Sequence, residues 1–375
     1  MATFRVSSEA DVVEVVRAAR DSRRTLEIVG HGTKRGFGRP VQCDDVLDLS
    51  GLSGIVSYES DEMIITARAA TPVAEIEAAL AEKNQRLGFE PADWGPLFGA
   101  PPNSATIGGV LSADANGSAA VRYGRCRDHL LGFRSVNGFG EAYKGGGKVV
   151  KNVTGFDLPK LFCGAMGTLG PLTEVTLRIF PKGSASEVFA VRADRRHGLA
   201  LLRSIWMSPL EATGLACTAE TAFIRLEGEA ESLKEKIAML RALVAPNLVL
   251  DDDGDFFRRI SSGKMFEDST PDVWRVVLPP SLAADCSRLD NRWVSDWAGG
   301  LHWLNATPGL AAEDLQRWLA HKDGRFTLVR ASEATRRLGQ IFPAEAPVRA
   351  ELTRRVKAAF DPLRLFNPGR MWEGV

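Results

Sequence analysis

The sequence lacks the features that mark several classes of protein. Its five cysteines (43, 126, 163, 217 and 286) are far apart and form no C-x-x-C pair, which argues against a zinc site or an iron–sulfur cluster. Lysine plus arginine and aspartate plus glutamate are equal at 47 each, so no net charge favours nucleic acid or anionic lipid. No apolar run approaches the roughly 20 residues that span a bilayer, and the N-terminus lacks the apolar core of a signal peptide. We expect a cytoplasmic protein with no metal, no nucleic-acid partner and no transmembrane segment, which reaches a membrane only through partners.

Glycine is abundant but unevenly placed. The 375 residues suffice for two domains with cores of their own. Glycine-rich stretches fall at 30–38, 99–117 and 138–170, whereas the second half is poorer in glycine and richer in tryptophan. This shift predicts a cofactor domain followed by a different domain.

The apolar periodicity predicts mixed helix and strand throughout the chain. Ser8 and Asp11 form a capping pair for a first helix, and Pro72 suits the first turn of a helix over 71–87. Short strands are expected at 26–29, 46–49, 55–58 and 63–66. After residue 183 the pattern predicts the ferredoxin-like order βαββαβ, at 188–193, 197–207, 213–218, 222–227, 229–244 and 247–251. Further strands are expected at 273–278 and 300–306, and further helices at 282–289, 311–321 and 346–360.

The first glycine-rich loop follows the strand at 26–29 directly. It contains Gly30, His31, Gly32, Thr33 and Lys34. Successive glycines let backbone N–H groups converge on an anion, and the lysine supplies a compensating charge, so a pyrophosphate is a suitable ligand. The loop matches neither the Walker A nor the G-x-G-x-x-G spacing, and a plain tight turn is the alternative.

Two further segments are built from small residues. The candidate ligand contacts in the second are Pro101, Asn103, Thr106, Ile107, Gly108, Gly109, Ser112, Asp114, Asn116 and Gly117. Small residues let the backbone approach a large flat ligand, although a buried turn is the alternative. The third segment runs from 145 to 177 and ends in an alternating strand after a glycine turn; its candidates are Gly164, Gly167, Thr168, Gly170 and Leu172.

Together the three segments resemble the FAD-binding domain of the vanillyl-alcohol oxidase and p-cresol methylhydroxylase superfamily. The matching motifs are GHGTK at 30–34, TIGGVLSADANG at 106–117, TGFDLPKLFCGAMGTLGPLTEVTLRIFP at 154–181 and FDPLRLFNPGR at 360–370. The resemblance implies an α+β fold: a two-part FAD-binding domain over 1–182, a ferredoxin-like cap over 183–345, and a segment over 346–375 that returns to the FAD domain.

Within this superfamily the run GGGKVVKNVTGFDLPKL and the short cap are similar to the FAD-binding subunits of bacterial glycolate oxidases. That resemblance implies an oxidoreductase that converts glycolate to glyoxylate together with a homologous catalytic flavin subunit and an iron–sulfur subunit. It also implies that residues 30–34 wrap the FAD pyrophosphate, 106–117 face the ribityl chain and flavin, and 164–175 contact the adenosine. Asn367 to Arg370 would close over the flavin.

Three departures from the superfamily pattern bear on chemistry. Covalent attachment uses a histidine where this chain has Gly32, with His31 one residue early, so non-covalent FAD is expected. Met166 replaces the usual glutamate before Gly167, and a thioether accepts hydrogen bonds poorly. The H-x-G-D-G-N motif of the members that oxidise 2-hydroxy acids is absent, and with it the obvious base for the hydroxyl proton.

The cap offers weaker candidates for substrate chemistry. His302 could act as a general base, with a packed strand histidine as the alternative, and Arg275 and Arg292 could bind a carboxylate. Three interpretations therefore stay open: an FAD-bearing subunit beside a catalytic chain, an independent dehydrogenase of a small 2-hydroxy acid, and a non-catalytic scaffold.

Overall fold

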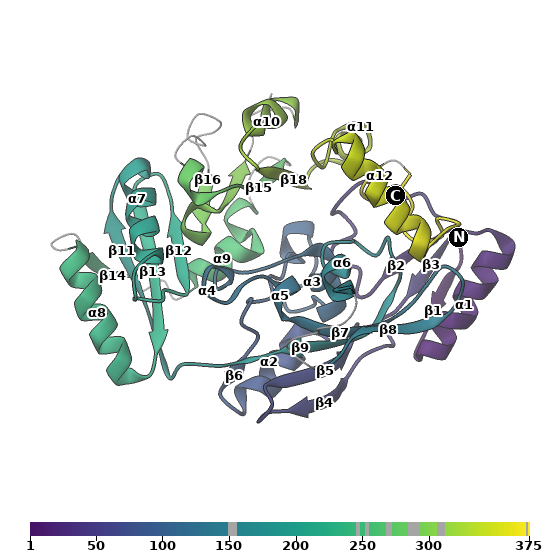
Figure 1. Ribbon diagram of the computed structural model, residues 1–375, viewed down its shortest axis with the longest axis horizontal. Helices are drawn as coiled ribbons and strands as arrows, with labels where there is room; N and C mark the ends of the chain where they lie inside the picture. Colours follow the sequence, from purple (N-terminus) through teal and green to yellow (C-terminus); the bar gives the residue numbers. More distant parts are fainter. Residues whose placement is uncertain are drawn as a thin grey trace.

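The computed structural model describes residues 1–148, 156–244, 248–251, 255–267, 272–283, 293–305, 312–372 and 374–375. The helix expected at 282–289 and Arg292 lie largely or wholly outside these residues. Two lobes lie side by side (Figure 1). The N-terminal lobe covers residues 1–181, and the cap is built on a sheet between residues 185 and 330.

The N-terminal lobe contains a small parallel sheet and a larger antiparallel one. The small sheet has the order β1-β3-β2, with β1 at Thr3–Arg5, β2 at Leu26–Val29 and β3 at Asp45–Asp48. The helix α1 (Glu9–Ser22) begins at the predicted Ser8–Asp11 capping box and packs its buried valines on this sheet. The larger sheet has the order β4-β5-β9-β7-β8. Its strands are β4 (Ile55–Glu59), β5 (Ile64–Arg68), β9 (Leu172–Arg178), β7 (Leu130–Val136) and β8 (Ala142–Gly146).

Short elements lie between and after the strands of the larger sheet. They are α2 (Val73–Ala81), α3 (Ile107–Ala113), α4 (Ala120–Tyr123), α5 (Cys126–His129), α6 (Leu158–Phe162) and the pair β6 (Gln85–Arg86) with β10 (Phe180–Pro181). The helix expected over 71–87 is wrong at its C-terminal end. It stops at Ala81 because Asn84 has a left-handed φ of 51°, and the chain then forms β6.

The cap is an eight-stranded antiparallel sheet with the order β14-β11-β13-β12-β16-β17-β15-β18. Its first part runs β11 (Ala185–Arg192), α7 (Arg195–Trp206), β12 (Gly214–Cys217), β13 (Thr221–Gly228), α8 (Ala230–Val244) and β14 (Leu248–Asp251), the expected βαββαβ order. The second part contains α9 (Phe256–Ser262), β15 (Val273–Val277), β16 (Trp293–Asp296), β17 (Leu301–Asn305), α10 (Ala312–Leu319) and β18 (Arg325–Arg330). The strands β16 and β18 were not predicted from the sequence.

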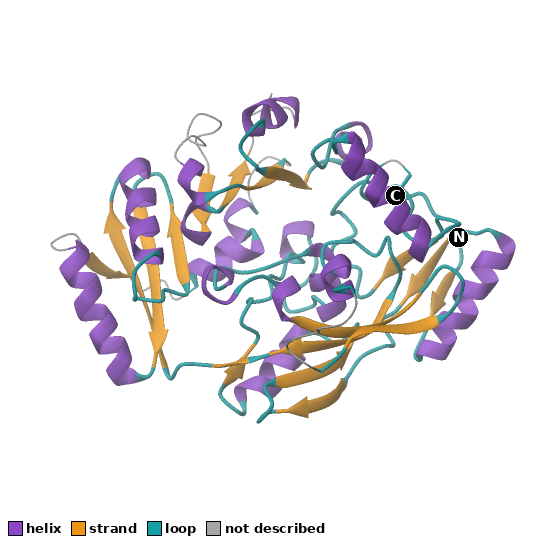
Figure 2. Cartoon of the chain, in the orientation of Figure 1, coloured by secondary structure: helices purple, strands orange, loops and turns teal. Residues whose placement is uncertain are grey.

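The two faces of the cap sheet have different partners. One face packs on α7, α8 and α10 (Figure 2) and forms the cap's own core. The other face contributes Val273, Leu301 and Trp303 to the core of the N-terminal lobe. Hydrogen bonds cross this boundary: Trp297 Nε1 donates to Gly117 O (3.0 Å), and Trp94 Nε1 donates to Ser261 O (3.0 Å).

The C-terminal segment returns to the small parallel sheet. After α11 (Glu333–Leu338), α12 (Pro347–Phe360) lies beside β2 and β3, close to the N-terminus (Figure 1). The N–H of Leu26 donates to Leu365 O (2.7 Å), and the N–H of Asn367 donates to Leu26 O (3.0 Å). The tail is therefore an integral edge of the N-terminal lobe.

Candidate cofactor-binding site

The loop 30–34 leaves β2 with its backbone donors free. In the described parts of the chain, none of the N–H groups from Gly30 to Lys34 donates to a protein acceptor. Gly32 has a φ of 70°, which glycine adopts without steric cost. A run of unpaired N–H groups in a tight loop can bind an anion. That this loop binds a pyrophosphate stays a prediction.

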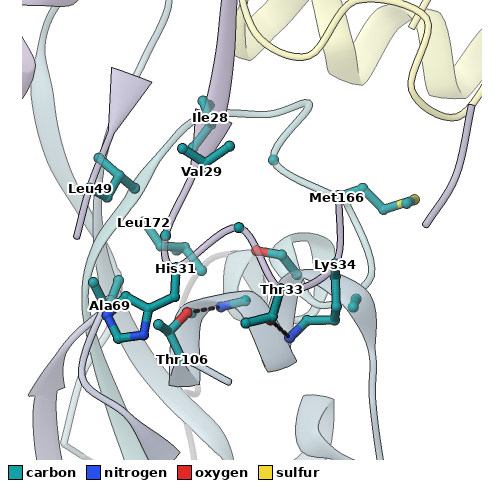
Figure 3. A pocket seen from close by; sticks show the side chains of 18 of the residues that line it. Ile28, Val29, His31, Thr33, Lys34, Leu49, Ala69, Thr106, Met166 and Leu172 are labelled. Carbon is teal, nitrogen blue, oxygen red and sulfur yellow. Dashed lines mark hydrogen bonds between the residues drawn. The ribbon is translucent and has the colours of Figure 1, made fainter. Parts of the chain in front are cut away.

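Lys34 adds a positive charge to this loop. Its half-buried amine donates to Thr33 Oγ1 at 3.3 Å (Figure 3). No described carboxylate lies within ion-pair distance of this amine. Burial lowers the pKa of Lys34 to about 8, with Asp93 opposing the shift. A bound anion would stabilise the charged amine.

The helix α3 forms the floor below the loop. Thr106 Oγ1 accepts the N–H of Gly109 (3.2 Å) and caps this helix (Figure 3). An added Cβ at Gly30 or at Gly109 would lie 2.9 Å from Thr106 Oγ1, so glycine is required for the loop and the helix to approach so closely. The first two N–H groups of α3 donate to Thr71 O and Ala69 O, so they are not available to a ligand.

The segment before β9 and the C-terminal tail close the opposite side. Asn367 Nδ2 donates to Met166 O (2.7 Å), and its Oδ1 accepts the N–H of Ile28 (2.8 Å). Arg370 Nη2 donates to the carbonyls of Lys34 and Arg35 (both 3.3 Å). The tail thus holds the anion-binding loop in place from behind.

These walls enclose a pocket of about 800 Å³, counted out to its open mouth. The predicted residues that line it are Gly30, His31, Gly32, Thr33, Lys34, Thr106, Gly108, Gly109, Ser112, Gly167, Gly170, Leu172, Asn367 and Arg370. A pocket with apolar walls and an anion cradle on one side suits a dinucleotide with a central pyrophosphate.

Other predicted residues lie outside this pocket. Ile107 and Thr168 are buried, Asn103 lines a separate cleft between the lobes, and Pro101 is exposed; Gly164 lies in the turn after α6. Asp114 and Asn116 hydrogen-bond to each other, and Gly117 O accepts a hydrogen bond from Trp297 Nε1 of the cap. A contact between these residues and FAD stays a prediction.

His302 is enclosed in the cap. It has no exposed surface, its Nδ1 shares a hydrogen bond with Ser295 Oγ (3.0 Å), and its Nε2 donates to Gly299 O (2.9 Å). Burial lowers the pKa of His302 to about 4. Both ring nitrogens are occupied, which matches the packed-histidine alternative.

Sequence reasoning missed several residues of the site. Ile28, Leu49, Ala69 and Ala70 line the pocket, yet they read only as ordinary strand and turn residues. Lys357 is buried and donates to Thr168 O (2.6 Å), although a lysine in a helical pattern usually faces solvent. No described helix is long and apolar enough to cross a membrane, and the described residues hold no group of three potential metal ligands.

Comparison with known proteins agrees with this geometry. Residues 1–146 match a family model described as an FAD binding domain. The glycolate oxidase subunit GlcE of Escherichia coli (strain K12) is 33% identical over 96% of this chain and 96% of its own length. The glycolate oxidase subunit GlcD of Bacillus subtilis (strain 168) is 35% identical over 33% of this chain and 25% of its own length.

A solved structure carries the same fold. The crystal structure of p-cresol methylhydroxylase with substrate bound superposes with a TM-score of 0.71 at 15% identity, over 98% of this chain and 88% of that chain. The expected p-cresol methylhydroxylase type of fold is thus confirmed, and the family model and the related subunit support FAD as the cofactor. That FAD occupies this pocket stays a prediction. The chain belongs to the family of FAD-linked oxidoreductases that includes the glycolate oxidase subunit GlcE.

Proposed function

We propose that this chain is the FAD-binding subunit of a glycolate-oxidising complex. The observation that carries the proposal is the 33% identity to a glycolate oxidase subunit over 96% of both chains. The shorter match to a second type of glycolate oxidase subunit supports a catalytic flavin partner that shares the N-terminal fold. An iron–sulfur subunit as the third member is an extension of this proposal.

The chain's own residues position the cofactor. The N–H groups of 30–34 and the Lys34 amine hold the pyrophosphate, while Asn367 and Arg370 keep the surrounding loops closed. Bound FAD supplies a hydride acceptor for oxidation of a carbon that bears a hydroxyl group. The hydroxyl proton needs a separate base, and His302 is enclosed among its own hydrogen bonds, so we place proton removal on the partner chain.

Anaerobic titration with glycolate tests this proposal. The flavin absorbance of the purified chain would be followed alone and after assembly with its partner subunits. The proposal predicts bleaching of the flavin in the assembly. Bleaching of the isolated chain would favour the independent dehydrogenase, and no bleaching in either preparation would contradict the proposal.

A further inference from the structure

Arg275 is buried at the boundary between the lobes with one edge of its guanidinium unpaired. It lies on β15, is 8% exposed, and its Nε and Nη2 have no hydrogen-bond partner among the described residues. These two atoms form the edge of the guanidinium that binds both oxygens of a carboxylate in parallel. The free edge therefore has the shape of a carboxylate site.

Aromatic rings enclose this guanidinium. Its carbon lies 5.2 Å from the ring centre of Trp297 and 5.9 Å from that of Trp94. Arg125 lies 6.0 Å from the same Trp297 ring, and its Nε is also buried without a partner in the described chain. Two cations thus share one indole, with unused donors on both.

The described carboxylates near this cluster form no ion pair with Arg275. Asp296 accepts from Ser118 Oγ (2.6 Å) and from the N–H of Trp297 (2.7 Å), and Asp114 is ion-paired with Arg125. Desolvation lowers the pKa of Arg275 to about 9; the repulsion from Arg125 adds to this shift, and the charge of Asp296 opposes it. Arg275 is a buried cation with no ion pair among the described residues, which is costly, so an anion from outside the chain would stabilise this arrangement.

The backbone nearby is also held in an uncommon conformation. Trp297 and Ala298 have φ values of 53° and 55°, in the left-handed region that non-glycine residues rarely adopt. Such strain persists where the surrounding structure enforces it, often at ligand sites. Here it places the Trp297 ring against both arginines while its Nε1 bonds to Gly117 O.

The cluster is adjacent to the cofactor pocket. Trp94 packs edge-on against Phe37 at 5.3 Å, and Phe37 lines the pocket. Asp114, the ion-pair partner of Arg125, is the C-cap of α3, which forms the pocket floor. A ligand on Arg275 would therefore lie on the cap side of the cofactor.

We propose that Arg275, with Arg125 beside it, binds the carboxylate of a small organic acid at the boundary between the N-terminal lobe and the cap. Bidentate binding on Nε and Nη2 would pair the two donors that have no partner in the described parts of the chain. That this acid is a 2-hydroxy acid rests on the proposed function, whereas the anion site does not. The isolated chain then has a substrate-binding element of its own.

Titration of the flavin-loaded chain with oxalate tests the site without turnover, because oxalate has no CH–OH group to oxidise. Binding would be followed by calorimetry and by the fluorescence of the tryptophans that flank Arg275. We expect saturable binding that weakens by about tenfold or more in Arg275→Met, since bonds to a charged donor are lost. Arg275→Lys should be intermediate because it retains the charge but loses the fork.

Arg195→Met is the matched control. Arg195 also stacks on a tryptophan, 4.0 Å from the ring centre of Trp293, but Trp293 belongs to the cap's own core. This variant should bind oxalate as the wild type does. Should Arg275→Met fail to retain flavin, the oxalate affinity of Arg275→Lys is compared with that of wild type, and weaker binding by Arg275→Lys supports the site.

The outcomes separate this inference from the proposed function. The anion site is overturned if the wild-type chain does not bind oxalate, or if both Arg275 variants bind oxalate as tightly as wild type. Either result holds even if glycolate bleaches the assembled flavin. Loss of oxalate binding in the Arg275 variants upholds the site, even if glycolate fails to bleach the assembly and the proposed function is abandoned.

Discussion

Replacing Lys357 with methionine tests how the C-terminal segment is fastened to the cofactor pocket. The amine of Lys357 donates to Thr168 O (2.6 Å), Asp361 Oδ2 (2.8 Å) and Phe366 O (3.0 Å). The Lys357 side chain is 2% exposed and that of Asp361 is fully buried. One ammonium therefore joins α12, the segment before β9 and the tail that carries Asn367 and Arg370.

The expected loss of stability follows from this burial. Methionine preserves the length of the side chain but leaves the Asp361 carboxylate without its counter-ion. Breaking a buried ion pair costs about 3–5 kcal/mol. Asp361 still accepts the N–H groups of Leu365 (2.9 Å) and Phe366 (2.8 Å), so we expect the lower part of that range.

Urea unfolding of wild type and Lys357→Met measures this loss. Lys160→Met is the control, because its ion pair with Asp157 is largely exposed and should contribute less than about 1 kcal/mol. The double variant Lys357→Met with Asp361→Asn should recover part of the loss, since no unpaired charge stays buried. A Lys357→Met chain within about 1 kcal/mol of wild type would refute the reasoning.

Three further predictions concern the lobe boundary and the flavin. Burial raises the pKa of Asp296 to about 6, so its charged form destabilises the folded state as pH rises from about 4 to 6. Relative to wild type, Asp296→Asn should therefore gain about 3 kcal/mol of unfolding free energy between about pH 4 and pH 7; a difference in urea unfolding that stays constant with pH would contradict this. Gly117→Ala should lower the free energy of unfolding by about 1–3 kcal/mol in thermal unfolding, because its Cβ would lie 2.6 Å from Glu90 Cβ. Gly147→Ala is the control, since a Cβ at Gly147 meets nothing within 4 Å. Equal losses in the two variants would argue against close packing around Gly117. Acid precipitation should release the flavin, because a glycine stands at the expected attachment position, and yellow colour in the pellet would show a covalent bond.

Local patterns in the sequence predicted much of the fold. The capping pair Ser8–Asp11 begins α1, and apolar alternation located the βαββαβ part of the cap. The strand β18 (Arg325–Arg330) also alternates apolar and polar residues at its start but was not predicted. The strand β16 (Trp293–Asp296) is too short to show a clear pattern. The prediction that α2 reaches residue 87 was wrong, because the left-handed backbone at Asn84 is not visible in the pattern of apolar residues.

The site was predictable only where local chemistry defines it. The loop 30–34 shows its glycines and its lysine, so the anion cradle could be expected from the sequence. Arg275 and Lys357 could not be predicted in this way. The burial and the partners of an isolated basic residue depend on strands and loops that are distant in the chain. Only tertiary structure shows that Lys357 is fully paired and that one edge of Arg275 has no partner among the described residues.

Every role proposed for the cofactor pocket depends on FAD binding at the loop 30–34. Equilibrium titration of the flavin-free chain with FAD, on wild type and Lys34→Met, measures this directly. The structure predicts one FAD per wild-type chain and a dissociation constant raised about 10- to 100-fold in Lys34→Met, because a charge-assisted contact to the pyrophosphate is lost. Lys234→Met, which changes an exposed amine on α8, should bind as wild type. Equal affinity in all three chains would contradict the placement of the pyrophosphate at this loop.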